Sequence, residues 1–270
     1  MHKESGAFVG DIPENYDRYL GPVLFAGHAA DLARRAGRHK AQAVLEVAAG
    51  TGILSRKLRD TLPDGVRLTV SDLNPPMLEI ARGKFTADEA VEFRQADALK
   101  LPFPDGAFDL VVCQFGVMFF PDKVAALRET RRVLCTGGRT LFNVWGPIEA
   151  NPFAQLADNV AARYFPDNPP GFYKVPFSYH DANAVARDLE AAGFDDIACE
   201  VLRSRVNIAD WAPFAHGMVY GNPLLDEIRA RSGVDPEHVV ATILDELRAR
   251  LGQEPAQLPL EATVFEARRQ

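Results

Sequence analysis

The chain has 270 residues, of which 47% are hydrophobic and 25% are charged, and its formal net charge is −7. This composition is typical of a globular protein with a large core. It argues against a nucleic-acid partner, which usually requires a basic stripe. The three cysteines, Cys113, Cys135 and Cys199, are far apart and form no CxxC pair. They predict neither a disulfide framework nor a metal site.

No apolar run reaches the 18 residues of a membrane span, and the first residues lack the apolar core of a secretion signal. We therefore expect no membrane span and a cytoplasmic location. We also expect a monomer or a homodimer.

Residues 12–36 predict a short helix and then a longer one over 24–36, because Gly21 and Pro22 interrupt the helical pattern. Tyr16 and Tyr19 would give this region an aromatic face. Residues 1–40 are therefore interpreted as a helical lid over a ligand, with packing on the sheet edge as the alternative.

From residue 43 onward, short apolar runs alternate with helical patterns. The expected strands are 43–49, 66–73, 91–96, 108–115 and 139–145, and the helices between them are 52–61, 75–85 and 121–134. Such alternation predicts an α/β fold, with parallel strands, right-handed crossovers and helices on both faces. Gly137 and Gly138 are expected to end the third of these helices.

The alternation of strand and helix patterns ends after residue 145. Helical segments over about 147–176 and 210–251 are expected to be cap insertions. A helix over 181–192 precedes two late strands, 197–208 and 258–268. The aromatic residues of the caps predict a pocket for a small aromatic or lipid-like molecule.

A strand, a glycine turn and a helix start follow one another over residues 44–55 (VLEVAAGTGILS). Gly50 and Gly52 allow a close approach of the backbone to a ligand, and the first N–H groups of the helix point toward it. This arrangement predicts a site for a nucleotide-like ligand.

Asp72, Asp97 and Gln114 each stand where a predicted strand ends. The carboxyl ends of parallel strands meet at one edge of a sheet, so these side chains should converge there. A carboxylate after the second strand can accept hydrogen bonds from a ribose diol, but dinucleotide-binding proteins share that geometry. Each acid taken singly is also explained as a capping or solvated turn residue.

A family resemblance rests on segments that follow one another at family spacing. They are 44–52 (VLEVAAGTG), 70–74 (VSDLN), 95–99 (QADAL) with 101–109 (LPFPDGAFD), and 131–134 (RRVL) before Gly137 and Gly138. Together they resemble class I S-adenosylmethionine (SAM)-dependent methyltransferases, within the small-molecule group that includes ubiquinone/menaquinone methyltransferases. The resemblance implies a doubly wound, mostly parallel seven-stranded sheet with an antiparallel C-terminal strand. Residues 41–270 would form this domain, with the two cap insertions.

The resemblance also implies SAM as cofactor and S-adenosylhomocysteine (SAH) as product. The implied cofactor-binding residues are Glu46, Ala48, Gly50, Thr51, Gly52, Asp72, Leu73, Met77, Asp97, Ala98, Gln114 and Phe115. Asp72 would hold the ribose hydroxyls, Leu73 and Met77 would flank adenine, and Asp97 would meet its amino group. Glu46 would organise the loop and the amino group of the ligand.

Methyl transfer from a sulfonium is an in-line displacement, and an oxygen or carbon nucleophile also needs a base. Imidazole and tyrosine suit that task. The candidate catalytic residues are His216, His180 and Tyr16, with His28 and Tyr19 as further candidates. The segment after the fourth strand lacks the Asn/Asp-Pro-Pro-Tyr/Phe motif, which disfavours methylation of DNA amines.

Two other functions stay open. A nicotinamide-dependent oxidoreductase would need GxGxxG, but Ser55 stands where its third glycine belongs. A non-catalytic partner or sensor module that binds SAM or SAH would keep the same motifs. The sequence therefore predicts a SAM-dependent methyltransferase acting on an O, N or C atom of a small molecule.

Overall fold

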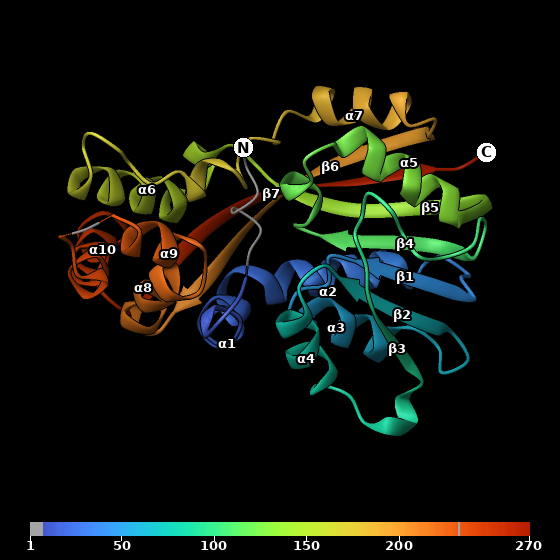
Figure 1. Cartoon of the computed structure of the whole chain (residues 1–270), viewed down its shortest axis with the longest axis horizontal. Helices are drawn as coiled ribbons and strands as arrows, with labels where there is room; N and C mark the ends of the chain where they lie inside the picture. Colours follow the sequence, from blue (N-terminus) through green and yellow to red (C-terminus); the bar gives the residue numbers. More distant parts are fainter. Residues whose placement is uncertain (1–7, 232) are drawn as a thin grey trace.

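The fold is seen in a computed structural model that describes residues 8–231 and 233–270. Seven strands form one sheet in the order β3-β2-β1-β4-β5-β7-β6. Their bounds are β1 Ala43–Val47, β2 Arg67–Asp72, β3 Val91–Gln95, β4 Phe108–Gln114, β5 Leu134–Trp145, β6 Asp195–Ile208 and β7 Ala256–Arg268. Strands β1 to β5 pair in parallel, and β7 runs antiparallel to both β5 and β6 (Figure 1). The predicted α/β fold with a mostly parallel seven-stranded sheet is confirmed.

Helices cover both faces of this sheet because neighbouring strand residues point to opposite sides. Val44 packs in one apolar cluster with Leu32 and Leu58, whereas Leu45 packs in another with Leu127 and Leu189. The helices of the first face are α2 Ala26–Ala36, α3 Ile53–Thr61 and α4 Pro75–Arg82, and those of the second are α5 Lys123–Val133 and α7 Ala182–Ala191 (Figure 1).

The N-terminal segment corrects one prediction. Helix α1 Ile12–Asn15, a π-helical segment Tyr16–Phe25 and α2 follow one another without a break. Pro22 lies inside the π-helical segment, so this proline does not end the helix. The expected boundary before residue 24 is therefore wrong. Residues 1–7 of the predicted lid lie outside the described residues.

Strand β5 also differs from its prediction. It begins at Leu134, directly after α5, and contains Gly137 and Gly138, which were expected to end the helix. The pairing of β4 with β5 shifts register between Phe108 and Leu110, and Gly137 has φ +81°. A register shift of this kind lets the strand continue through a residue with positive φ.

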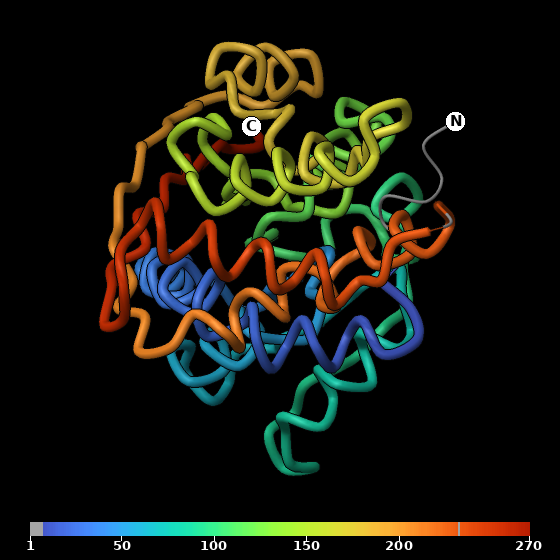
Figure 2. The backbone as a smooth tube through the Cα atoms, turned by 90° about the vertical axis from the view of Figure 1, so that its left-hand side faces the viewer, coloured from blue at the N-terminus to red at the C-terminus, as the bar shows by residue number. Residues whose placement is uncertain are grey.

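A second group of helices lies beyond the carboxyl ends of the parallel strands (Figures 1 and 2). It contains α6 Pro152–Tyr164, α8 Trp211–Tyr220, α9 Leu224–Arg229 and α10 Pro236–Leu251. Trp211 and Phe214 are among its fully buried side chains. Short 3-10 turns cover Ala87–Glu89, Val117–Phe119, Ile148–Ala150 and Phe172–Lys174. The helices and the sheet together enclose the space described next.

Candidate active site

A cleft of about 850 Å³ opens at the carboxyl ends of β1, β2 and β4. Its lining includes nine residues that the sequence assigned to a cofactor. These are Ala48, Gly50, Asp72, Leu73, Met77, Asp97, Ala98, Gln114 and Phe115. The predicted convergence of Asp72, Asp97 and Gln114 on one edge is what the structure shows.

The two glycines of the turn after β1 have different surroundings. A Cβ on Gly50, which has φ +56°, would meet no atom within 4 Å, so this glycine presents bare backbone to the cleft. A Cβ on Gly52 would lie 2.8 Å from the Cβ of Ala81. Gly52 therefore allows α3 to pack on α4 and does not line the cleft. Thr51 lines a smaller adjoining cavity of about 280 Å³.

Asp72 connects the ends of β1 and β2. Its Oδ2 accepts a hydrogen bond from the Gly50 amide at 2.8 Å, and its Oδ1 accepts one from the Asn74 amide at 2.8 Å. Burial raises the pKa of this carboxyl, and the two amide hydrogen bonds oppose that shift. Asn74 Nδ2 also donates to Oδ1, at 3.3 Å. A carboxylate has room for about four acceptor contacts, so Oδ2 of Asp72 can accept a further hydrogen bond from the cleft.

Glu46 is fully buried in β1 and does not line the cleft. Neither of its carboxyl oxygens has a hydrogen-bond partner among the described residues. Burial raises its pKa to about 8, and the nearby Ser55 hydroxyl opposes that shift. A buried carboxyl without partners is costly, and a cation or hydrogen-bond donor reaching it directly or through water would lower that cost.

The ends of β1 and β4 are held in a strained, closely packed arrangement. Ala48 and Phe115 have φ of +54° and +52°. A Cβ on Gly116 would lie 2.6 Å from the Cβ of Ala48. The Phe115 amide donates to the side-chain oxygen of Asn143 at 3.0 Å, which fixes this turn. Backbone strain of this kind is concentrated at functional sites.

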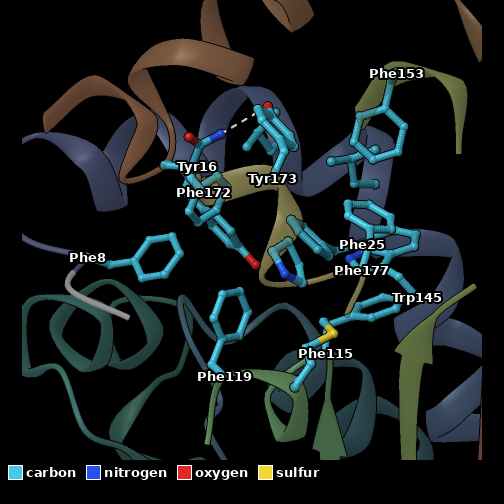
Figure 3. A pocket seen from close by; sticks show the side chains of 15 residues that line it. Phe8, Tyr16, Phe25, Phe115, Phe119, Trp145, Phe153, Phe172, Tyr173 and Phe177 are labelled. Atoms are coloured by element: carbon cyan, nitrogen blue, oxygen red, sulfur yellow. Dashed lines mark hydrogen bonds between the residues drawn. The ribbon is translucent and has the colours of Figure 1, made fainter. Parts of the chain in front are cut away.

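A second cavity, of about 500 Å³, adjoins the cleft (Figure 3). It is lined by Phe8, Tyr16, Leu20, Leu24, Phe25, Phe115, Met118, Phe119, Trp145, Phe153, Phe172, Tyr173, Pro176, Phe177 and Asn222. Phe8, Tyr16, Phe115 and Phe119 line the cleft as well. No lining residue carries a charge. We call this space the aromatic cavity.

Phe115 and Trp145 form the wall nearest the sheet. Their rings stack with centroids 4.0 Å apart; Phe115 directly follows β4, and Trp145 ends β5 at the same edge. His28 packs edge-on against both rings, at 5.2 Å and 5.5 Å. Burial lowers the pKa of His28 to about 4, so this imidazole is neutral.

Of the three candidate catalytic residues, the structure brings only Tyr16 to these spaces. His180 is exposed, with Nδ1 2.7 Å from the carbonyl oxygen of Phe177. His216 stacks on Tyr220 at 4.4 Å and meets Tyr19 edge-on at 5.1 Å. Neither histidine lines the cleft or the aromatic cavity. His180 precedes α7, and His216 lies on the face of α8 that contacts Tyr19 and Tyr220.

The sequence analysis did not predict some of the residues that line the cleft and the aromatic cavity. Phe119 and Phe120 belong to the turn after β4, and Trp145 ends β5. The rule that placed Asp72 and Gln114 at the edge could also have placed Trp145 there. Phe8 had no such signal, because it precedes the first helix.

Among the described residues, no cluster of His, Cys, Asp or Glu is suited to a metal ion. In the same part of the chain, no helix is long and apolar enough to cross a membrane.

The sheet order, the reversed strand β7 and the glycine turn facing Asp72 agree with the fold that the resemblance to class I methyltransferases implies. Residues 45–142 match the family model described as a methyltransferase domain.

The chain is similar to ubiquinone/menaquinone methyltransferases. The demethylmenaquinone methyltransferase of Deinococcus radiodurans is 40% identical over 149 residues, 54% of this chain and 61% of that protein. The same enzyme of Thermus thermophilus is 50% identical over 111 residues, 41% of this chain and 50% of that protein. The matched part of the chain thus spans between 50% and 61% of the length of these two relatives.

Solved structures of more distant proteins share the fold. YcgJ of Bacillus subtilis is 22% identical, with a TM-score of 0.59 over 90% of this chain and 99% of that protein. Phosphoethanolamine N-methyltransferase 2 of Haemonchus contortus, solved in complex with SAM, is 18% identical. Its TM-score is 0.59 over 95% of this chain and 56% of that protein.

Proposed function

We propose that this protein transfers a methyl group from SAM to a small, apolar acceptor molecule. The observation that carries the proposal is the junction of two spaces at the carboxyl edge of the sheet. One is a cleft with a glycine turn and a buried carboxylate, and the other is an aromatic cavity. Tyr16 and Phe115 line both, so ligands in the two spaces would touch.

The residues of the cleft fit the parts of SAM. Asp72 Oδ2 keeps an acceptor position for a ribose hydroxyl, and Gly50 leaves room beside the backbone for the methionine part. Leu73 is 56% exposed and lines the cleft, where it can pack on an apolar face of adenine. The unpartnered carboxyl of Glu46 would gain from the ammonium group of the methionine part, reached directly or through water.

SAM supplies an electrophilic methyl carbon on a positively charged sulfur. The chain's task is to hold the acceptor in line with that carbon and to exclude water. Phe115, fixed by Asn143, forms the shared wall between the two spaces. Tyr16 places its hydroxyl there, and burial together with Asp72 raises its pKa above the usual value, so it stays protonated.

The names of the relatives agree with this proposal. Two of them are demethylmenaquinone methyltransferases, which supports methylation of a small molecule. The part of the chain that they match contains the cleft. We further propose a cytoplasmic location, a monomer or homodimer, and no nucleic-acid partner.

A SAM-binding module without activity would need the cleft alone. The aromatic cavity that opens on the cleft favours an enzyme. Ser55 at the position of the third dinucleotide-binding glycine disfavours a nicotinamide cofactor.

Calorimetry with SAH, SAM and NADH tests the cofactor, and we expect SAH and SAM to bind and NADH not to bind. A radiolabelled-SAM assay across a panel of small molecules then tests transfer. Binding of NADH in preference to SAH contradicts the proposal.

A further inference from the structure

We propose that Lys123 is a positioning residue for methyl transfer. It holds the turn after β4 against the segment 172–180, at the junction of the cleft and the aromatic cavity. The inference rests on the proposed function and concerns a side chain that lines neither of the two spaces. Lys123 would act through its contacts with Phe120 and Tyr179.

The turn after β4 and the segment 172–180 form facing walls of the junction. Phe119 lines both spaces, and Phe120 lines the cleft. Phe172, from the facing segment, lines the aromatic cavity, and its ring stacks on that of Phe119 with centroids 6.5 Å apart (Figure 3). The distance between the two segments therefore sets the width of the place where the two ligands would touch.

Lys123 contacts both of these segments. Its Nζ donates a hydrogen bond to the carbonyl oxygen of Phe120 at 3.1 Å. The same atom lies 5.1 Å from the centroid of the Tyr179 ring. An ammonium group over an aromatic face is attracted by the negative face of the ring. One side chain thus joins the turn after β4 to the segment 172–180.

Tyr179 is itself fixed in place. Its hydroxyl donates to Oδ2 of Asp188 in α7 at 2.7 Å, and the side chain is buried. Burial and the Asp188 carboxylate raise the pKa of Tyr179, so the phenol stays protonated and able to donate. Hydrogen bonds in such a chain polarise one another, which strengthens the attraction between the ring and Lys123. The ammonium group therefore lies on a ring that is anchored to α7.

The position of Lys123 in its helix is unfavourable for a cation. Helix α5 begins at Lys123, and the positive end of a helix dipole disfavours a cation in the first turn. Burial also lowers the pKa of Lys123, although Asp188 and Asp122 oppose that shift. The contacts with Phe120 and Tyr179 offset these costs, which explains a half-buried lysine at the start of this helix.

The test begins with SAH binding to the full-length protein by calorimetry. Wild type is measured first, and its failure to bind overturns the proposed function before any variant is made. Lys123→Met keeps most of the apolar stem and removes the ammonium group, so it should bind SAH about three- to tenfold more weakly. Lys123→Arg keeps a cation that reaches both contacts and should bind within about twofold of wild type. Lys57→Met, at an exposed lysine of α3, is the matched control and should bind normally.

A double-mutant cycle tests whether Lys123 acts through Tyr179. Tyr179→Leu removes the ring and should weaken SAH binding. The double variant with Lys123→Met should bind SAH no more weakly than the weaker of the two single variants, because both remove the same contact. Independent effects would multiply. Thermal unfolding establishes that each variant is folded. If Tyr179→Leu does not fold, Tyr179→Phe replaces it, since it keeps the ring and loses only the bond to Asp188.

Turnover with the acceptor from the labelled-SAM panel provides the readout that a merely structural contact would not move. The kcat of Lys123→Met should fall at least about tenfold, more than its SAH affinity falls, because misplaced ligands cost more in the transition state than in binding. Lys123→Arg should restore it. The proposal is overturned if Lys123→Met keeps wild-type SAH affinity, if its kcat falls no more than its SAH affinity, or if the losses in the cycle multiply.

Discussion

The carboxylate of Asp72 accepts a hydrogen bond from the Gly50 amide at 2.8 Å, and this bond joins the ends of β1 and β2. One side chain thus fixes the glycine turn and faces the cleft that the turn borders. Removing it would disturb the shape of the site and remove an acceptor at the same time. Asp72 is therefore the residue at which ligand binding and local structure are most closely connected.

Asp72→Ala is expected to weaken SAH binding at least tenfold. Hydrogen bonds to a charged acceptor are worth about 1.5–3 kcal/mol, and the Gly50 amide also loses its partner. Calorimetry gives the dissociation constants. Asp64→Ala is the control, because Asp64 is exposed in a turn outside the cleft. An unchanged SAH affinity in Asp72→Ala would remove Asp72 from the site.

The sequence alone predicts those parts of the site that depend on patterns of neighbouring residues. Strand ends, a glycine turn and polar residues after β2 and β4 all follow from patterns of a few residues. Gly50, Asp72 and Gln114 are therefore at the predicted edge. Gly52 shows the limit, since its contact with Ala81 depends on how α3 packs on α4.

The aromatic cavity could not be derived in the same way. Its lining extends from Phe8 to Asn222 and comes from the N-terminal helix, the strand ends and the cap helices. Which aromatic residue faces inward depends on packing between distant segments. His180 and His216 were reasonable candidates by chemistry, but His180 lies exposed in the turn before α7 and His216 packs between Tyr19 and Tyr220.

These two histidines give a direct prediction. His180→Ala and His216→Ala should each keep kcat/KM within about threefold of wild type, because neither residue lines the cleft or the cavity. Steady-state kinetics with the acceptor found in the labelled-SAM panel provides the measurement. A loss of more than a hundredfold in either variant, with normal folding, would restore that histidine as a catalytic residue.

Gly116→Ala is expected to destabilise the protein by about 1–3 kcal/mol, because overpacking forces the surrounding groups to move. The added Cβ would lie 2.6 Å from the Cβ of Ala48 and 2.7 Å from Cys113 Sγ. SAH binding should also weaken, since the ends of β1 and β4 would move apart. Denaturant unfolding measures the free energy of unfolding.

Gly65→Ala is the matched control for that variant. A Cβ on Gly65 would meet no atom within 4 Å, so its stability should change by less than about 0.5 kcal/mol. If Gly116→Ala is as stable as Gly65→Ala, the close packing of the two strand ends is contradicted.

The buried carboxyl of Glu46 makes the stability of the SAM-free protein depend on pH. Burial raises its pKa from 4.5 to about 8, so the folded state binds this proton more tightly than the unfolded state does. The free energy of unfolding should therefore fall as pH rises from about 4.5 to 8.

Glu46→Gln cannot titrate, so it should gain stability relative to wild type across that range. A relative gain of at least about 1.4 kcal/mol between pH 5 and pH 8 is expected, one pKa unit's worth. Urea unfolding at both pH values measures it. Parallel pH dependence in the two proteins would show that Glu46 is ionised without cost, and that the site already provides its partner.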